Sequence, residues 1–81
     1  MTREDVLQSL TDIFRDEFDD EELIIEETTT SDDIEDWDSF ANVNMVTAIE
    51  HTFHMKFAMG EVNTMKNVGE MMDIIMERMQ V

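Results

Sequence analysis

The sequence predicts an all-α protein, a four-helix bundle with three long helices and one short helix. Three observations support this fold class. Apolar residues recur every three or four positions in three separate stretches, no stretch shows the alternation of a strand, and the 81 residues include no Pro. The chain also shows no internal repeat and no linker. We therefore expect a single domain over residues 1–81, which can bury roughly 60–65% of the surface of its unfolded chain.

The first predicted helix covers about residues 3–18. Thr2 with Asp5 three positions later is a variant of the capping box, in which two side chains satisfy free N–H groups at a helix start. The apolar stripe of this helix is Val6, Leu7, Leu10, Ile13, Phe14 and Phe18. A connection of about twenty residues follows, and loops that long are uncommon in compact domains unless they pack or have a function. We expect it to be anchored by Leu23, Ile24, Ile25, Ile34 and Trp37.

The second predicted helix covers about residues 39–54. Its expected apolar stripe is Phe40, Val43, Val46, Ile49 and Phe53. Gly60 marks the loop that follows, and residues 61–65 are predicted to form the short helix. Asn67 with Glu70 repeats the cap pattern at the start of the last helix. The stripe of that helix is Val68, Met71, Met72, Ile75 and Met79.

The charge of the chain is large and unevenly distributed. The net charge is −16, and residues 1–40 hold sixteen acidic residues against two arginines, a net charge of −14. Such a surface repels nucleic acids and anionic lipids, so we expect neither as a partner and expect partners with basic docking surfaces. Crowded carboxylates should also raise one another's pKa values, so that mild acidification would stabilise the fold.

The composition favours a cytoplasmic protein, and we expect it to be a monomer. The chain contains no Cys, which excludes disulfides and thiolate metal sites and suits a reducing compartment. No apolar run approaches the roughly 20 residues of a membrane span, and residues 1–5 do not resemble the start of a secretory signal.

Enzyme and metal functions are not supported by the motifs. Neither acidic run contains the Gly of an EF-hand calcium loop. His51 and His54 share a helical face, but no nearby motif supplies further zinc ligands. Ser39 has no hydrolase motif around it. We therefore expect no catalytic residues and no metal site.

Asp38-Ser39-Phe40 lies where the acidic connection becomes an apolar helix. The first N–H groups of a helix have no intrahelical partner, and the helix dipole makes this end positive, so a phosphate ester on Ser39 would be favourably placed. Taken alone, the tripeptide is also compatible with a simple N-cap. In its context it resembles the Asp-Ser-Leu prosthetic-group site of acyl carrier proteins.

The resemblance to acyl carrier proteins covers nearly the whole chain, including the order of the helices and the long loop. The matching segments are Trp37-Asp38-Ser39, the positions Val43, Val46, Ala48, Ile49, Glu50 and Phe53, and Asn67-Val68-Gly69 with Met72-Asp73-Ile74-Ile75. The resemblance implies a freestanding acyl carrier protein in which Ser39 bears a covalent 4'-phosphopantetheine arm and Asp38 supports the serine. It also implies two kinds of partner: a phosphopantetheinyl transferase, and enzymes that activate or transfer acyl groups in a lipid, polyketide or related pathway.

Two departures from the family pattern indicate a specialised rather than a housekeeping member. Phe40 stands where the family usually has Leu, and the polar face of the second helix is largely uncharged where the family commonly has several acids. The residues expected to contact partners are Phe40, Asn44, Thr47, Glu50 and His51. The alternative from another functional class is an unmodified acidic helical adaptor that binds a basic protein through residues 1–40.

Overall fold

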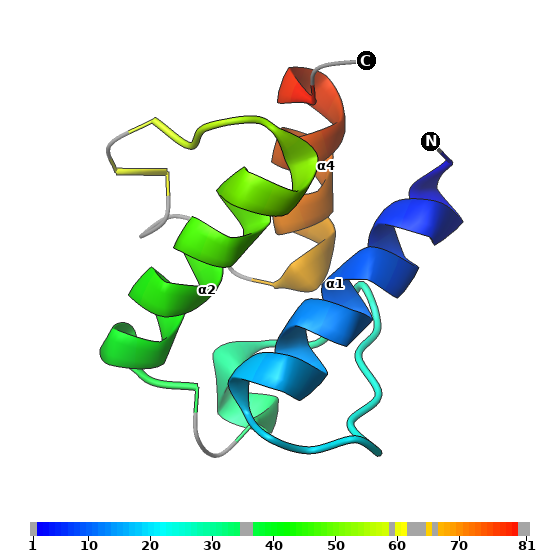
Figure 1. The fold of residues 1–81 in the computed structure, drawn as a ribbon, viewed down its shortest axis with the longest axis vertical. Coiled ribbons are helices and arrows are strands. Elements are labelled where there is room, and N and C mark those ends of the chain that lie inside the picture. The colour runs from blue at the N-terminus through cyan, green and yellow to red at the C-terminus, as the bar shows by residue number, and fades with distance from the viewer. Residues whose placement is uncertain (1, 35–36, 59, 62–64, 66, 80–81) are drawn as a thin grey trace.

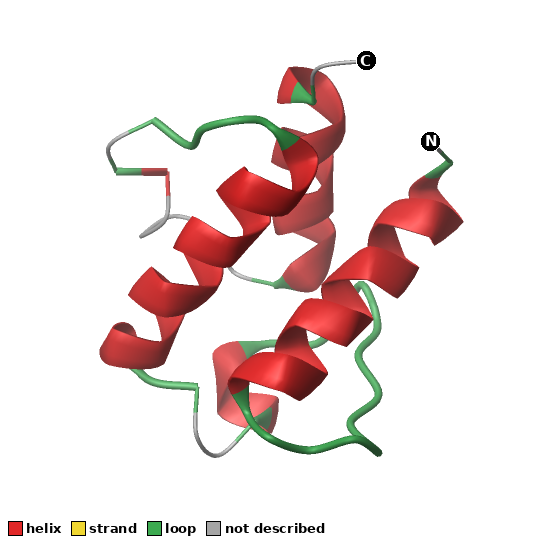
Figure 2. Cartoon of the chain, viewed as in Figure 1, coloured by secondary structure: helices red, strands yellow, loops and turns green. Residues whose placement is uncertain are grey.

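The protein folds as a small group of helices joined by long connections, as the computed structural model shows (Figures 1 and 2). The structure describes residues 2–34, 37–58, 60–61, 65 and 67–79. The helices are α1 (Arg3–Glu17), the 3-10 helix η1 (Ser31–Asp33), α2 (Ser39–Phe53) and α4 (Val68–Arg78). In Figure 1, α1 and α2 pack side by side in roughly opposite directions, with α4 behind them and in contact with α1. The described residues contain helices, turns and irregular segments but no strand, so the all-α prediction is confirmed.

The predicted short helix at residues 61–65 falls largely outside the described residues, which do not include positions 62–64. Glu61 itself is helical. The N–H of Met65 donates to the carbonyl of Glu61 at 3.2 Å, which is the bond of one helical turn. A fourth helix therefore stays a prediction.

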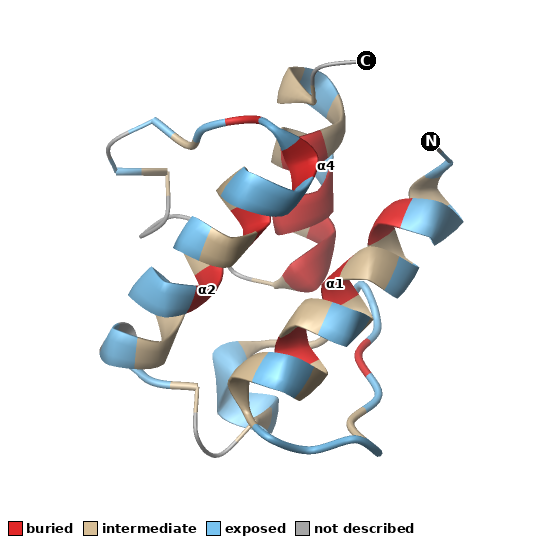
Figure 3. Ribbon diagram, in the orientation of Figure 1, coloured by how far each residue is buried: buried red, intermediate tan, exposed pale blue. Residues whose placement is uncertain are grey.

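The core lies where the three long helices face one another, as the buried residues, drawn in red in Figure 3, show. The fully buried positions of α1 are Val6, Leu10 and Phe14, which confirms the predicted stripe of the first helix. The predicted stripe of the last helix is also confirmed, with Met79 half-buried and the others buried; α4 buries Val68, Gly69, Met71, Met72 and Ile75. No helix in the described part of the chain is long and apolar enough to cross a bilayer.

The predicted stripe of α2 is wrong at its first two positions. Phe40 is 77% exposed and Val43 is 62% exposed, whereas Met45 is fully buried with Ile49 and Phe53. Each step of three residues turns a helix by about 300°, so a series of such steps spirals around the helix instead of following one face. Apolar residues surround most of α2, and the packing against its neighbours selects the buried face.

The expected anchors of the long connection are confirmed with one exception. Ile25 is buried, and Leu23, Ile34 and Trp37 are packed partly against the core. Ile24 is 75% exposed, so its expected role as an anchor is wrong. Ile24 lies between the half-buried Leu23 and the buried Ile25 in an irregular segment, so the apolar character of a loop residue does not by itself decide whether it is buried.

The long connection docks against the start of α4 through backbone hydrogen bonds. The N–H of Gly69 donates to the carbonyl of Glu27 at 2.8 Å, and the N–H of Val68 donates to that of Thr29 at 2.9 Å. These bonds satisfy donors that a helix start otherwise leaves unpaired. A Cβ atom at Gly69 would lie 3.0 Å from the carbonyl oxygen of Glu27, so Gly permits this close approach.

Arg3 ties three segments together that are far apart in sequence. One guanidinium nitrogen lies 2.7 Å from the carboxylate of Glu27 in the connection, and another lies 2.7 Å from that of Asp73 in α4. These partners lie 24 and 70 residues from Arg3, and no local sequence pattern indicates them.

Hydrogen bonds lower the pKa values of three carboxyl groups. The side chain of Arg3 lowers the pKa of Glu27, and the backbone N–H of Thr2 lowers the pKa of Asp5. The hydrogen bond from the backbone N–H of Ala58 lowers the pKa of Glu61 most, and the hydrogen bond from the side chain of Arg78 lowers it further. The expectation that crowding raises carboxyl pKa values is therefore wrong for these three groups, because a donor at hydrogen-bonding distance stabilises the carboxylate more than distant like charges destabilise it.

Candidate functional site

The candidate site is the start of α2, where Ser39 is the first helical residue, as predicted. Asp38 is the N-cap, and its Oδ1 accepts the N–H of Ala41 at 2.8 Å. The carbonyl of Asp38 accepts the N–H of Asn42 at 2.9 Å, which is the first bond of the helix. The side chain of Ser39 lies outside the described part of the structure. Its backbone position follows from the cap, because the Asp38 side chain determines where helical geometry begins.

Trp37 holds the end of the long connection in place immediately before the cap. Its ring packs edge-on against Phe14 of α1, with ring centroids 5.2 Å apart. Its indole Nε1 donates to Oδ1 of Asn42 in α2 at 3.1 Å. The position of Ser39 is therefore set from two sides, by the core of α1 and by the first turn of α2.

The residues on either side of Ser39 are exposed. Asp38 is exposed, and Phe40 is the most exposed large apolar side chain among the described residues. The dipole of a helix places partial positive charge at its N-terminus, which favours an anionic group attached there. Such a position can hold a phosphate ester and leave a group attached to it free to move.

The predicted partner-contacting residues divide into two groups. Phe40, Asn44, Thr47 and His51 are exposed. Glu50 is half-buried, and its Oε2 accepts the N–H of Phe57 at 2.8 Å. Glu50 thus holds the connection that follows α2.

Two features of this site were not predicted from the sequence. The bond between Trp37 and Asn42 joins residues five apart across a helix start, and no known cap pattern indicates it. Val43 was assigned to the core but is exposed one turn after Phe40. The arc of exposed residues on α2 could have been found by placing all its residues on a helical projection instead of following steps of three.

His51 and His54 are both exposed. His54 is the C-cap of α2, with a left-handed backbone at φ 53°. Among the residues that the structure describes, no group of three or more His, Asp or Glu side chains could hold a metal ion.

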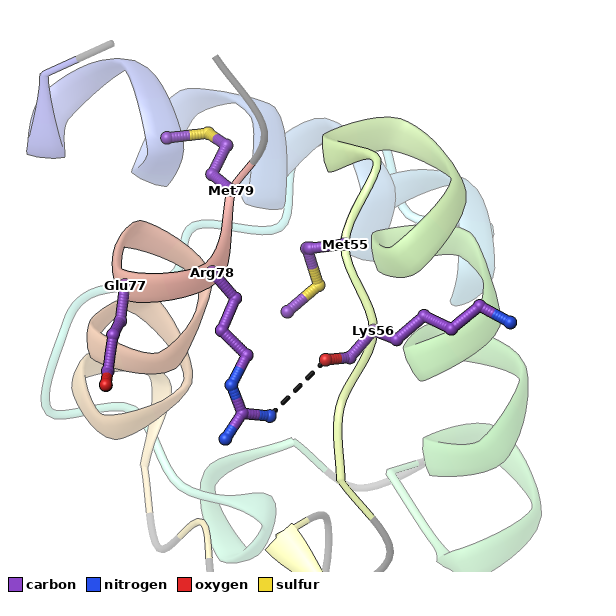
Figure 4. A pocket seen from close by; sticks show the side chains of 5 residues that line it. All are labelled: Met55, Lys56, Glu77, Arg78 and Met79. Carbon is purple, nitrogen blue, oxygen red and sulfur yellow. Dashed lines mark hydrogen bonds between the residues drawn. The ribbon is translucent and has the colours of Figure 1, made fainter.

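A separate hollow lies at the other end of α2. It is an open depression of about 520 Å³, and Figure 4 shows its lining residues: Met55, Lys56, Glu77, Arg78 and Met79. Arg78 donates to the carbonyl of Lys56 at 3.4 Å and pairs with Glu61. The 15 residues of α2 span about 22 Å, so this hollow is not part of the site at Ser39.

Comparison with solved structures identifies a close match for this arrangement. The fold resembles the solution NMR structure of holo acyl carrier protein from Geobacter metallireducens, with a TM-score of 0.83 and 37% sequence identity. The match covers 90% of this chain and 84% of that one. No protein-family model matches the sequence, and a search of curated proteins found no match.

The class that the fold and the comparison define is a small helical carrier domain. At this identity and coverage, the chain belongs to the acyl carrier protein family, which confirms the resemblance inferred from the sequence. Acyl carrier proteins are carriers and not enzymes, so the prediction that this chain is not an enzyme is also confirmed by its family.

Proposed function

We propose that this chain is one carrier domain in which Ser39 bears a covalent 4'-phosphopantetheine arm. The observation that carries the proposal is the position of Ser39 as the first residue of α2 in a chain of the acyl carrier protein family. The related protein of known structure is described as the holo form, which supports a prosthetic group in this chain too.

The residues around Ser39 have separate roles in this proposal. Asp38 supports the serine by fixing the start of the helix, and the dipole of α2 favours the phosphate of the arm. Trp37 positions the whole turn through its contacts with Phe14 and Asn42. A phosphopantetheinyl transferase installs the arm from coenzyme A, and the thiol of the arm then holds acyl groups as thioesters.

The arm presents its cargo to enzymes that activate or transfer acyl groups in a lipid, polyketide or related pathway. Phe40 and the uncharged side chains Asn44 and Thr47 favour partners of a dedicated pathway over those of housekeeping fatty-acid synthesis. The cytoplasm is the compartment that we propose, because the cysteine-free sequence suits it.

The test is modification of the protein in vitro. We expect a broad-specificity phosphopantetheinyl transferase with coenzyme A and Mg²⁺ to add one phosphopantetheine to the wild-type protein, detected by mass spectrometry. Ser39→Ala should abolish this addition completely and change the melting temperature little. Wild-type protein that never gains the mass would instead support the unmodified acidic adaptor, and an alanine variant that still gains it would place the arm elsewhere.

A further inference from the structure

The guanidinium of Arg3 makes five hydrogen bonds, as many as it has N–H groups. Nε and Nη2 donate to Oε1 of Glu27 at 3.0 and 2.7 Å, and Nη1 donates to Oδ1 of Asp73 at 2.7 Å. Nη2 also donates to the carbonyl of Gly69 at 3.4 Å. The remaining contact runs from Nη1 to Sδ of Met76 in α4, at 3.9 Å. Four of the five acceptors are therefore oxygen atoms, and the fifth is a sulfur atom.

The sulfur of Met76 is the weakest of these acceptors. A thioether accepts hydrogen bonds poorly, whereas bonds from a cation to a carboxylate are short and strong. Oxidation of methionine to its sulfoxide places an oxygen on this sulfur and makes the side chain polar. That oxygen would lie beside an N–H group of Arg3 that already faces the sulfur. The structure thus provides a donor for the oxidised form of Met76 that the reduced form hardly uses.

The methionines differ in how easily a dissolved oxidant can reach them. Met55 is 5% exposed, and three others are fully buried: Met45, Met71 and Met72. The described methionines that are half-buried are Met65, Met76 and Met79. Among the residues that the structure describes, Met76 is the methionine whose sulfur accepts a hydrogen bond. Accessibility and a waiting donor therefore coincide at one position.

We propose that Met76 is a site of reversible oxidation by peroxide and that Arg3 binds the resulting sulfoxide. A lone pair of the thioether sulfur attacks one oxygen of hydrogen peroxide. The S–O bond forms as the O–O bond breaks, and the proton of the attacked oxygen moves to the departing hydroxide, which leaves as water. The sulfur loses two electrons and the peroxide gains them. A methionine sulfoxide reductase can return the thioether.

The sulfoxide at Met76 strengthens the contact between α1 and α4. A polar sulfoxide in an apolar environment usually disrupts packing. At Met76 the bond from Arg3 offsets this cost, and Arg3 stays held by Glu27 and Asp73. The oxidised protein therefore keeps its fold. This inference concerns a different part of the molecule from Ser39 and does not rest on the proposed function.

The first experiment uses Gln as a stable substitute for the sulfoxide, because its side-chain carbonyl is an acceptor at a similar distance from the backbone. Met76→Leu is the apolar reference, since Gln and Leu have similar helix propensities. With Arg3 present, the melting temperature of Met76→Gln should lie within about 1 °C of that of Met76→Leu or above it. In the Arg3→Leu background, the Gln variant should melt about 4 °C below its Leu counterpart, because the polar group then lacks its donor.

Met79 supplies the matched control, because it is also half-buried and its sulfur accepts no hydrogen bond from the described residues. Met79→Gln should melt about 4 °C below Met79→Leu in both backgrounds. A difference between Gln and Leu at Met76 that is the same with and without Arg3 would overturn the inference. An equal dependence on Arg3 at Met79 would overturn it too, because the effect would then not be specific to Met76.

The second experiment tests the oxidation itself in the wild-type protein. Dilute hydrogen peroxide is added to the folded chain, and tandem mass spectrometry locates each added oxygen. We expect oxygen on Met76 while Met71 and Met72 stay reduced, and we expect a methionine sulfoxide reductase to remove it. A folded chain that gains no oxygen at Met76 would refute the site. Equal oxidation of Met76 and the buried Met71 would refute it as well, since the unfolded chain would then be what reacts.

Discussion

Helices α2 and α4 both begin after a polar residue whose side-chain oxygen accepts the N–H of the third helical residue. At α2, Asp38 accepts the N–H of Ala41 at 2.8 Å. At α4, Asn67 accepts the N–H of Glu70 at 2.9 Å. Within the helix itself, the two starts use the same N-cap contact.

The two starts differ in what surrounds them. At α4, the N–H groups of Val68 and Gly69 donate to the long connection, and both residues are buried. At α2, Asp38 and Phe40 are exposed on either side of Ser39. A helix start that a loop covers, as at α4, contributes to the stability of the fold. A helix start whose flanking residues are exposed, as at α2, stays accessible to another molecule.

The largest expected effect concerns Trp37, which positions the exposed start of α2. Trp37→Ala should lower the free energy of unfolding by about 3 kcal/mol, because it removes a large aromatic ring that packs against Phe14. Chemical denaturation monitored by circular dichroism measures it. Trp37→Phe keeps most of the packing but loses the hydrogen bond to Asn42, and it should cost about 1 kcal/mol. A loss below about 1 kcal/mol for the alanine variant would show that Trp37 does not anchor the connection.

The next effect contrasts equivalent positions of the two helices, since Gly69 and Phe40 are each the second helical residue. Gly69→Ala should cost about 2 kcal/mol, because the new Cβ would lie 3.0 Å from the carbonyl oxygen of Glu27 and would push the connection away. Phe40→Ala should change stability by less than about 0.5 kcal/mol, because its side chain is exposed. Equal losses in denaturant titrations of the two variants would contradict the contrast between a covered and an exposed start.

Removal of the caps should affect both helices alike. Asp38→Ala and Asn67→Ala should each cost about 1 kcal/mol, since each leaves one backbone N–H of the first turn without its side-chain partner. Their Ser variants, which can still accept the bond, should recover most of the loss. The same denaturant titrations measure both pairs, and a loss at one helix alone would mean that the shared N-cap contact is not equivalent at the two ends.

The smallest expected effect is the dependence of stability on pH. It arises at the start of α4, which the long connection covers. The pKa of Glu27 is lowered by Arg3, so its carboxylate contributes stability that is fully present above its unfolded pKa of about 4.3. That contribution is lost as the pH falls through the lowered pKa of the folded state. In thermal melts from pH 6 to pH 3, the difference in melting temperature between wild type and Glu27→Gln should therefore shrink. A difference that stays constant over this range would refute the linkage.

The sequence alone was sufficient for the features that depend on residues within about four positions of one another. The extents of α1 and α2, the cap contacts of Thr2 and Asn67, and the start of α2 at Ser39 all follow from local spacing and capping. The family resemblance also came from such local segments, because the order and spacing of the helices can be predicted from the sequence. Along a helix, hydrogen bonds and buried apolar positions recur every three to four residues. The local sequence is therefore enough to predict them.

Tertiary structure alone decided which surfaces these helices bury and which they leave open. Apolar residues occur nearly all around α2, and the buried face is selected by the positions of α1 and α4, so Met45 is buried while Phe40 and Val43 are exposed. The pairing of Arg3 with Asp73 and the docking of Glu27 on Gly69 join segments that local patterns cannot relate. The physical reason is that burial depends on what lies across from a residue, and that neighbour is set by the folded chain, not by the adjacent sequence.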